Sequence, residues 1–308
     1  MRLKLGRPDL SRYADHFDVP AAEGDFSVTF LGVSTLLIDD GSSAILTDGF
    51  FSRPPMLSVL ARPLAPHLPR IGDCLDRAGI DRLAAVIPVH GHFDHALDSA
   101  VVAERTGAVL VGGTSVANLG RGAGLPEDRI LTPAPGSDLV LGPWTLTLIE
   151  SHHCPPDRYP GEITTPLTPP ARAAAYRCGE AWSILVRHTG GRSLLVQGSA
   201  GYVIGSLAGH AAEVAYLGIG QLGVQSEAYI QTYWDETVRR TGARRAVLTH
   251  WDDFFSPLPM TADEPPLRAL PYAGDDLDVT MRVLSRLAER DGVALSFPTL
   301  WRRENPWT

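Results

Sequence analysis

A cluster of four metal-binding side chains directly follows a short apolar segment. Residues 83–89 read Leu-Ala-Ala-Val-Ile-Pro-Val and predict a buried strand, and residues 90–95 read His-Gly-His-Phe-Asp-His. Imidazole and carboxylate groups are ligands of zinc and similar metals, and a strand end holds such groups more firmly than a free loop. Three of the chain's ten histidines lie in this stretch, which argues against a chance polar turn. We therefore expect two pairs of ligands, one pair for each of two ions: His90 with His92, and Asp94 with His95.

This motif resembles the His-x-His-x-Asp-His signature of the metallo-β-lactamase-fold hydrolases. The resemblance runs from about Phe26 to Asp253 and implies an α/β (α+β) fold, a four-layer αββα sandwich with two mixed β-sheets. The early segment Phe-Leu-Gly-Val-Ser-Thr-Leu-Leu-Ile and the late segment His-Trp-Asp-Asp-Phe look closest to one branch of the family. That branch contains ascorbate-phosphate lactonases and N-acyl-phosphatidylethanolamine phospholipase D.

The order of the expected elements is typical of such a sandwich. An early hairpin is signalled by Asp39-Asp40-Gly41-Ser42, and amphipathic helices are expected over residues 97–105, 227–240 and 277–290. The chain is expected to begin with strands joined in a hairpin and to continue with helices between later strands. This order predicts two mixed sheets covered by helices. Because no linker is visible, we expect one metallo-β-lactamase-like domain over residues 1–308, with its core at about 26–300. The expected strands are residues 26–31, 35–38, 44–47, 84–89, 108–111, 144–150, 183–187, 193–197, 213–219, 245–249 and 293–297.

The resemblance implies further ligands at other strand ends. The family's third histidine follows a strand where this chain has both His152 and His153. His153 is favoured, because many relatives place a single histidine just before a small residue and proline, and His152 is the alternative. The family's final histidine matches His250, expected beside Asp94 and His95. Asp48 ends an early strand and is expected to orient a histidine by accepting its free N–H.

The main departure from the family pattern is Ser199. The segment Gln-Gly-Ser at residues 197–199 stands where relatives read Gly-Asp, and that Asp bridges the two metals. A bridging carboxylate supplies a negative charge between two cations, and a neutral hydroxyl does not. Either the second ion binds more weakly, or another acid compensates, or the site works with one ion. Asp252 and Asp253 are the nearest candidates for a compensating acid.

Substrate contacts are expected from the loops around these strand ends. The Pro-rich segment 155–170 is expected to be irregular and to act as a lid or binding loop. Arg53 or Arg158 could hold an anionic group, although a surface ion pair is the simpler expectation for each. Phe254 and Phe255 are expected to form either an apolar patch or part of the core. Cys154 could be a ligand or a reactive thiol, although a plain small residue is the simpler expectation.

Composition narrows the class of protein. The net charge of −8 does not favour nucleic acid as a partner. The three cysteines are widely spaced, which suits a reducing compartment. No segment approaches the roughly 20 apolar residues of a membrane span, and residues 1–19 lack a secretory signal. We expect a cytoplasmic protein with a small-molecule substrate and, as the commonest assembly, a homodimer.

The leading functional hypothesis is a metal-dependent hydrolase with one or two Zn²⁺ ions, Mn²⁺ or Fe being alternatives. It would act on an ester, lactone or phosphodiester bond through metal-activated water, and Asp94 would exchange a proton during catalysis besides binding metal. The alternative from another class is a non-catalytic metal-binding or ligand-sensing protein with a degenerate site, which Ser199 suggests. Iron-dependent redox chemistry and a nuclease fit less well, because no flavin domain or inserted RNA-processing domain is visible.

Overall fold

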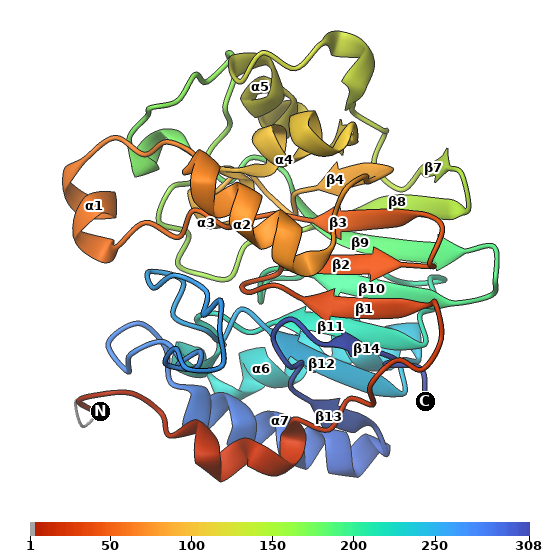
Figure 1. Cartoon of the computed structure of the whole chain (residues 1–308). Helices are drawn as coiled ribbons and strands as arrows, with labels where there is room; N and C mark the ends of the chain where they lie inside the picture. Colours follow the sequence, from red (N-terminus) through yellow and green to blue (C-terminus); the bar gives the residue numbers. More distant parts are fainter. Residues whose placement is uncertain (1–3) are drawn as a thin grey trace.

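Two mixed β-sheets stacked face to face form the centre of the protein, as the computed structural model of residues 4–308 shows (Figure 1). The first sheet has the strand order β14-β1-β2-β3-β4-β5-β6, and the second has the order β13-β12-β11-β10-β9-β8-β7. The strands of the first sheet are β1 (Ser27–Phe30), β2 (Leu36–Asp39), β3 (Ala44–Thr47), β4 (Ala85–Ile87), β5 (Val109–Val111), β6 (Ile130–Leu131) and β14 (Arg303–Glu304). Those of the second are β7 (Asp138–Leu141), β8 (Trp144–Ser151), β9 (Ala181–His188), β10 (Ser193–Gln197), β11 (Val214–Gly218), β12 (Arg245–Thr249) and β13 (Ala294–Ser296).

Each sheet combines an antiparallel half with a parallel half. Strands β1, β2 and β3 pair antiparallel, whereas β3 to β6 pair parallel. Strands β7 to β10 pair antiparallel, and β10 to β13 pair parallel. Antiparallel strands can be joined by tight hairpins, and parallel strands need longer crossovers. Crossovers that contain helices connect the parallel strands here, except for the irregular crossover from β10 to β11, and these helices cover the outer faces.

The helices form the two outer layers. They are α1 (Met56–Ala61), α2 (Leu68–Ala78), α3 (Phe93–Ala96), α4 (Ser99–Thr106), α5 (Thr114–Gly122), α6 (Glu227–Trp234), which continues as a π-helical turn over Asp235–Arg239, and α7 (Leu277–Asp291). Short 3₁₀ turns lie at Leu10–His16, Glu127–Arg129, Ala173–Ala175 and Leu222–Val224. Residues of α2, α4 and α5 pack on the first sheet, while α6 and α7 pack beside the second. Among the described residues, no helix has both the length and the apolar character needed to cross a membrane.

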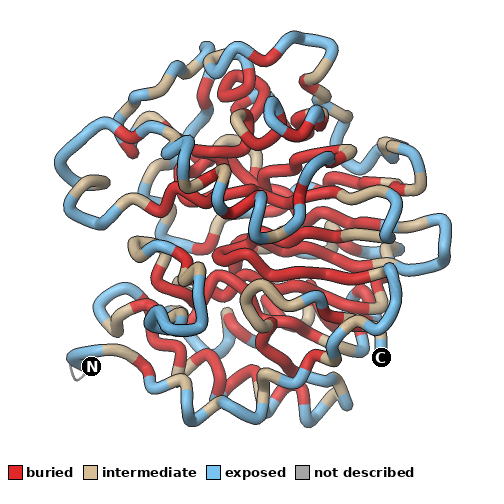
Figure 2. The backbone as a smooth tube through the Cα atoms, in the orientation of Figure 1, coloured by how far each residue is buried: buried red, intermediate tan, exposed pale blue. Residues whose placement is uncertain are grey.

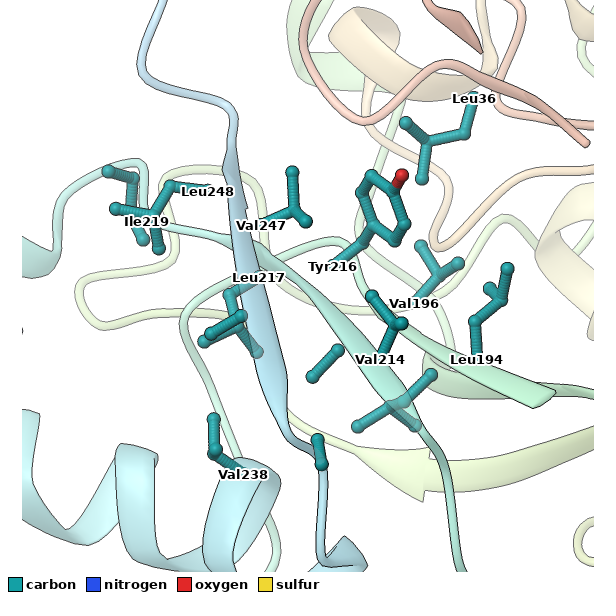
Figure 3. Close-up of a cluster of buried hydrophobic side chains, with 14 of the residues drawn as sticks. Leu36, Leu194, Val196, Val214, Tyr216, Leu217, Ile219, Val238, Val247 and Leu248 are labelled. Atoms are coloured by element: carbon teal, nitrogen blue, oxygen red, sulfur yellow. The ribbon is translucent and has the colours of Figure 1, made fainter. Parts of the chain in front are cut away.

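Side-chain alternation along the strands separates two cores. On β3, Ile45 points into the core between the sheets, and its neighbour Leu46 points to the core under α2 and α4. This is the period-2 geometry of a strand that is buried on both faces. The sheets therefore form the buried interior, with exposed segments around them (Figure 2). Figure 3 shows part of the core between the sheets, where Val196, Tyr216 and Val247 come from neighbouring strands of the second sheet.

The fold class predicted from the sequence is confirmed: two mixed sheets lie between layers of helices. Two of the expected helices differ in detail. The helix expected over residues 97–105 is α4, and a separate helix, α3, precedes it. The helix expected over 227–240 becomes a π-helical turn after Trp234. Residues 155–170 contain no helix or strand, as expected for so proline-rich a segment.

Candidate metal centre

Three histidines from two strand ends converge on one point. His90 and His92 follow β4, and His153 follows β8. One ring nitrogen of each lies within 4.8 Å of the other two, and Nε2 of His90 lies 3.1 Å from Nδ1 of His92. The ring of His153 lies across from both, with centroid distances of 5.0 Å and 4.7 Å. We call this set the three-histidine group.

A second group lies directly beside the first. Asp94 and His95 belong to α3, and His250 follows β12. Asp94 Oδ2 lies 3.5 Å from Nε2 of His250 and 3.8 Å from Nε2 of His95. The rings of His90 and His95 are 4.1 Å apart between centroids, which joins the two groups. We call Asp94, His95 and His250 the Asp–His group.

The donor atoms of both groups fit a divalent ion. Two nitrogens that share a tetrahedral zinc at 2.0–2.1 Å lie roughly 3.3 Å apart, close to the 3.1 Å between the His90 and His92 nitrogens. Nε2 of His95 is buried, faces Asp94 and has no hydrogen-bond partner among the described residues. Leaving a buried polar atom unpaired is costly, so a bound cation would complete this environment.

Two of the histidines, His90 and His153, are held in the neutral form that metal binding requires. Burial, together with the neighbouring His95 and His92, keeps the pKa of His90 well below its usual value. Burial and His92 lower the pKa of His153 to about 4. Both rings therefore keep a lone pair available at neutral pH.

Asp48 holds His95 in the orientation that the group needs. Its Oδ2 accepts a hydrogen bond of 2.8 Å from Nδ1 of His95, and its Oδ1 accepts one of 2.9 Å from the backbone of Val89. Both side chains of the Asp48–His95 pair are fully buried. This contact turns Nε2 of His95 toward Asp94, which is the geometry that an orienting role requires.

The structure distinguishes between the two neighbouring histidines after β8. His153 lies in the three-histidine group, and its Nδ1 donates to the carbonyl oxygen of Cys154, which leaves Nε2 free. His152 is exposed and lies in neither group. Cys154 is fully buried, and burial raises the pKa of its thiol to about 12, so a reactive thiol is not supported.

Asp157 is a site residue that the sequence analysis missed. Its Oδ1 lies 3.2 Å from Nε2 of His92, and the carbonyl oxygen of Tyr159 lies 3.3 Å from the same nitrogen. Both belong to the Pro-rich segment, so this segment packs directly on a ligand of the three-histidine group. The available signal was an acidic residue four positions after His153, in a segment already expected to border the site.

The proposed compensating acids are engaged elsewhere. Oδ1 of Asp252 accepts from the backbone of Val33 at 2.9 Å, and Oδ2 pairs with Nη2 of Arg53 at 2.6 Å. Asp253 pairs with Arg7 at 2.8 Å. Of the three alternatives for the missing bridge, compensation by Asp252 is therefore not supported, because both its oxygens are engaged by Val33 and Arg53. The expected surface role of Arg53 is wrong, because this ion pair is fully buried.

Ser199 lies beside the centre but bonds to the protein. Its Oγ accepts a hydrogen bond of 2.9 Å from the backbone N–H of Cys154, and the side chain is 7% exposed. It borders the same cavity as the ligands. The position therefore contributes a neutral oxygen to the wall of the site.

Strained backbone surrounds the centre. Val33, Asp48 and His250 have φ angles of 51°, 53° and 58°. A positive φ is uncommon for residues other than glycine, and in a β-branched residue such as Val33 it is an outlier. The backbone N–H of His250 donates to the carbonyl oxygen of Val33 at 2.8 Å, which links two of these positions. Strain of this kind concentrates at functional sites.

A cavity of about 380 Å³ opens onto both groups. Ligand side chains of both groups and Ser199 form its polar end. Aromatic and aliphatic side chains, among them Phe93, Phe254 and Leu60, form most of the remaining wall. Arg158 also borders this cavity and is exposed.

Comparisons with known proteins agree with this architecture. Residues 28–168 match the sequence profile of the Metallo-beta-lactamase superfamily. A UPF0173 metal-dependent hydrolase from Myxococcus xanthus (strain DK1622) is 29% identical over 134 residues, which cover 43% of this chain and 41% of that relative. The match thus spans less than half of the relative's length.

Solved structures share the fold at low sequence identity. A possible metal-dependent hydrolase from Veillonella parvula DSM 2008 aligns with a TM-score of 0.55 and 14% identity, covering 91% of this chain and 99% of that one. CmlA, a diiron beta-hydroxylase from Streptomyces venezuelae, aligns with a TM-score of 0.55 and 12% identity, covering 92% of this chain and 54% of that one. The resemblance indicated by the His-x-His-x-Asp-His motif is therefore confirmed by the profile match over residues 28–168 and by the shared fold.

Proposed function

We propose that this chain, which has the metallo-β-lactamase fold, is a metal-dependent hydrolase of small molecules. The observation that carries the proposal is the pair of ligand groups at one end of a cavity. The relative from Myxococcus xanthus is named a metal-dependent hydrolase, which supports the same class of reaction. The bond cleaved would be an ester, a lactone or a phosphodiester.

The residues divide into two roles in this proposal. His90, His92 and His153 would hold one ion, and Asp94, His95 and His250 would hold the other. A bound divalent ion lowers the pKa of a water molecule and polarises the bond under attack.

Asp94 is proposed to accept a proton as well as to bind metal. It borders the cavity, so a group held there can reach it. Burial alone would raise the pKa of Asp94, but the adjacent His95 and His250 outweigh this effect and lower it. The carboxylate is therefore ionised at neutral pH, which is the form that can bind a metal ion and accept a proton.

Zinc is the metal that we propose, because the ligands are imidazole nitrogens with a single carboxylate. Iron is the alternative outcome of a metal analysis, since a protein of the same fold, CmlA, is a diiron enzyme. A cavity of about 380 Å³ is of the size that binds a small molecule.

We also propose one domain and a reducing compartment such as the cytoplasm. Side chains from both sheets share the core between them, which supports a single folding unit. Cys74, Cys154 and Cys178 are all buried and unpaired, which suits a compartment where disulfides do not form.

A substrate screen tests the proposed function. The protein is purified without chelator and assayed with lactones, thioesters and phosphodiesters in the presence of Zn²⁺, Mn²⁺ or Fe²⁺. We expect saturable turnover that a chelator abolishes and added metal restores. His90→Ala and His92→Ala should lose this turnover with the fold intact by circular dichroism, and the exposed His152→Ala is the matched control. Full turnover in His90→Ala would exclude the proposed centre, and metal binding without any turnover would favour the non-catalytic alternative.

A further inference from the structure

We propose that the substrate carries an uncharged apolar arm, which lies between helix α1 and the Phe254–Phe255 pair while the reacting bond sits at the metal ligands. This inference rests on the proposed function and specifies the class of its substrate: an ester, lactone or phosphodiester with an alkyl or aryl substituent.

One wall of the cavity is aromatic and starts at a metal ligand. The ring of Phe254 lies 5.5 Å from the ring of His250 and 4.4 Å from that of Phe255, between centroids. The ring of Phe93 lies 6.5 Å from that of Phe254, between centroids. All three phenylalanines border the cavity. The apolar surface therefore begins next to the place where a bond would be cleaved.

Another part of the cavity wall is formed by α1, a short helix whose apolar side chains are largely uncovered. Met56, Val59 and Leu60 border the cavity. Met56 is 46% exposed and Leu60 is 67% exposed. Helix α1 has no buried residue, so it contributes little to the core of the protein. A bound apolar group would cover this surface.

The charge of the lining supports an uncharged arm. The acidic member of the lining is Asp94, which belongs to the ligand set, and the basic member Arg158 is exposed. Between the ligands and the exposed edge of the cavity, the wall is mostly carbon. A charged arm would lose its hydration along this wall, where the basic side chain is that of the exposed Arg158.

Burial of such an arm predicts a dependence of affinity on chain length. Removing one methylene group from water contributes about 0.8 kcal/mol, which is about fourfold in affinity. Ligands that share one metal-binding head and differ only in their alkyl tails should therefore differ in affinity by this factor per methylene. The gain in affinity per methylene should stop when the tail extends past α1 into water.

The test uses alkyl hydroxamates, in which a bidentate chelating head carries a tail of increasing length. Aceto-, butano-, hexano- and octanohydroxamate are titrated into the metal-loaded protein by calorimetry. We expect affinity to rise about fourfold for each methylene that enters the cavity. Equal affinities would overturn the apolar arm while the metal centre stands. Absence of binding by all four would overturn the metal centre, and this inference with it.

Two leucines of α1 provide a matched pair of variants. Leu60 borders the cavity, whereas Leu57, 79% exposed on the same helix, does not. Leu60→Ser should lower the affinity for octanohydroxamate about tenfold and leave that for acetohydroxamate unchanged. Leu57→Ser should change neither. Equal losses in the two variants would overturn the placement of the arm along α1.

Discussion

Asp157 contacts the outer nitrogen of His92, whose inner nitrogen faces the three-histidine group. Oδ1 of Asp157 lies 3.2 Å from Nε2 of His92, and Nδ1 of the same ring lies 3.1 Å from Nε2 of His90. A carboxylate that accepts the outer N–H fixes the ring and makes its other nitrogen more basic. The Pro-rich segment therefore supports the candidate metal centre in addition to bordering the cavity.

The first prediction concerns this support. Asp157→Ala should weaken metal affinity about 10–100-fold, because His92 loses the carboxylate that orients it. Competition with a chromophoric chelator measures the change. Glu162→Ala, an exposed acidic residue in the same segment, is the control and should keep the wild-type affinity. Equal affinities in the two variants would show that Asp157 does not position His92.

The second prediction concerns the missing bridge. Because Asp252 and Asp253 are bonded elsewhere, we expect the second ion to bind more weakly than the first. Ser199→Asp should raise the affinity for the second ion by tenfold or more, since a carboxylate adds a negative charge between two cations. Metal content and calorimetric titration measure both sites.

Ser199→Asn is the matched control for this charge effect. Asn has nearly the size of Asp and no charge, so the second ion should bind about as weakly as in the wild type. Tight binding of two ions by the wild-type protein would contradict the argument, and so would an equal gain in the two variants.

The elements that the sequence predicted best are those whose interactions are local or fully apolar. The bounds of β3, β10 and β12 match the prediction residue for residue, because short apolar runs between turn signals leave few alternatives. Strand β7 was missed because it is a partly exposed edge strand. Helix α5 was missed because its sequence, Thr-Ser-Val-Ala-Asn-Leu-Gly-Arg-Gly, contains two glycines, which weaken a helix.

The same contrast holds for the candidate site. The motif at residues 90–95 carries its information within six residues, and the structure brings its four side chains into the two groups. The contacts of Asp157 with His92 and of Arg53 with Asp252 were not predicted, because they form only through folding. Arg53 and Asp252 are 199 positions apart in the chain, and no local sequence pattern predicts such a contact.

The third prediction concerns that buried ion pair. Arg53→Met should destabilise the fold by about 3–5 kcal/mol, because the charge of Asp252 is left buried without its partner. Urea unfolding measures the loss. The double variant Arg53→Met/Asp252→Asn should lose less than the single variant, since it removes the unpaired charge.

A surface pair provides the comparison for this effect. Arg121 and Glu127 form an ion pair of 2.7 Å with both side chains well exposed. Arg121→Met should cost no more than about 1 kcal/mol. A loss of stability as small as this in Arg53→Met would contradict the expectation that burial makes the Arg53–Asp252 pair costly to break.

The fourth prediction concerns the hairpin turn at Asp40 and its stability at acid pH. The Asp40 carboxylate accepts hydrogen bonds from the backbone of Ser42 and Ser43 at 2.7 Å each and from Nε2 of His188 at 2.9 Å. Burial alone would raise the pKa of Asp40, but these hydrogen bonds outweigh it and lower the pKa from 3.8 to about 2. A lowered acid pKa stabilises the fold at pH values above the unfolded pKa of 3.8, and this contribution is lost as the pH falls toward 2.

Asp40→Asn should therefore cost about 2 kcal/mol at about pH 5.5 and about 1 kcal/mol at about pH 3, as measured by urea unfolding at both values. Asp15→Asn, at an exposed position, should change stability little at either pH. An equal cost of Asp40→Asn at the two pH values would mean that the turn is stabilised by the shape of the side chain and not by its charge.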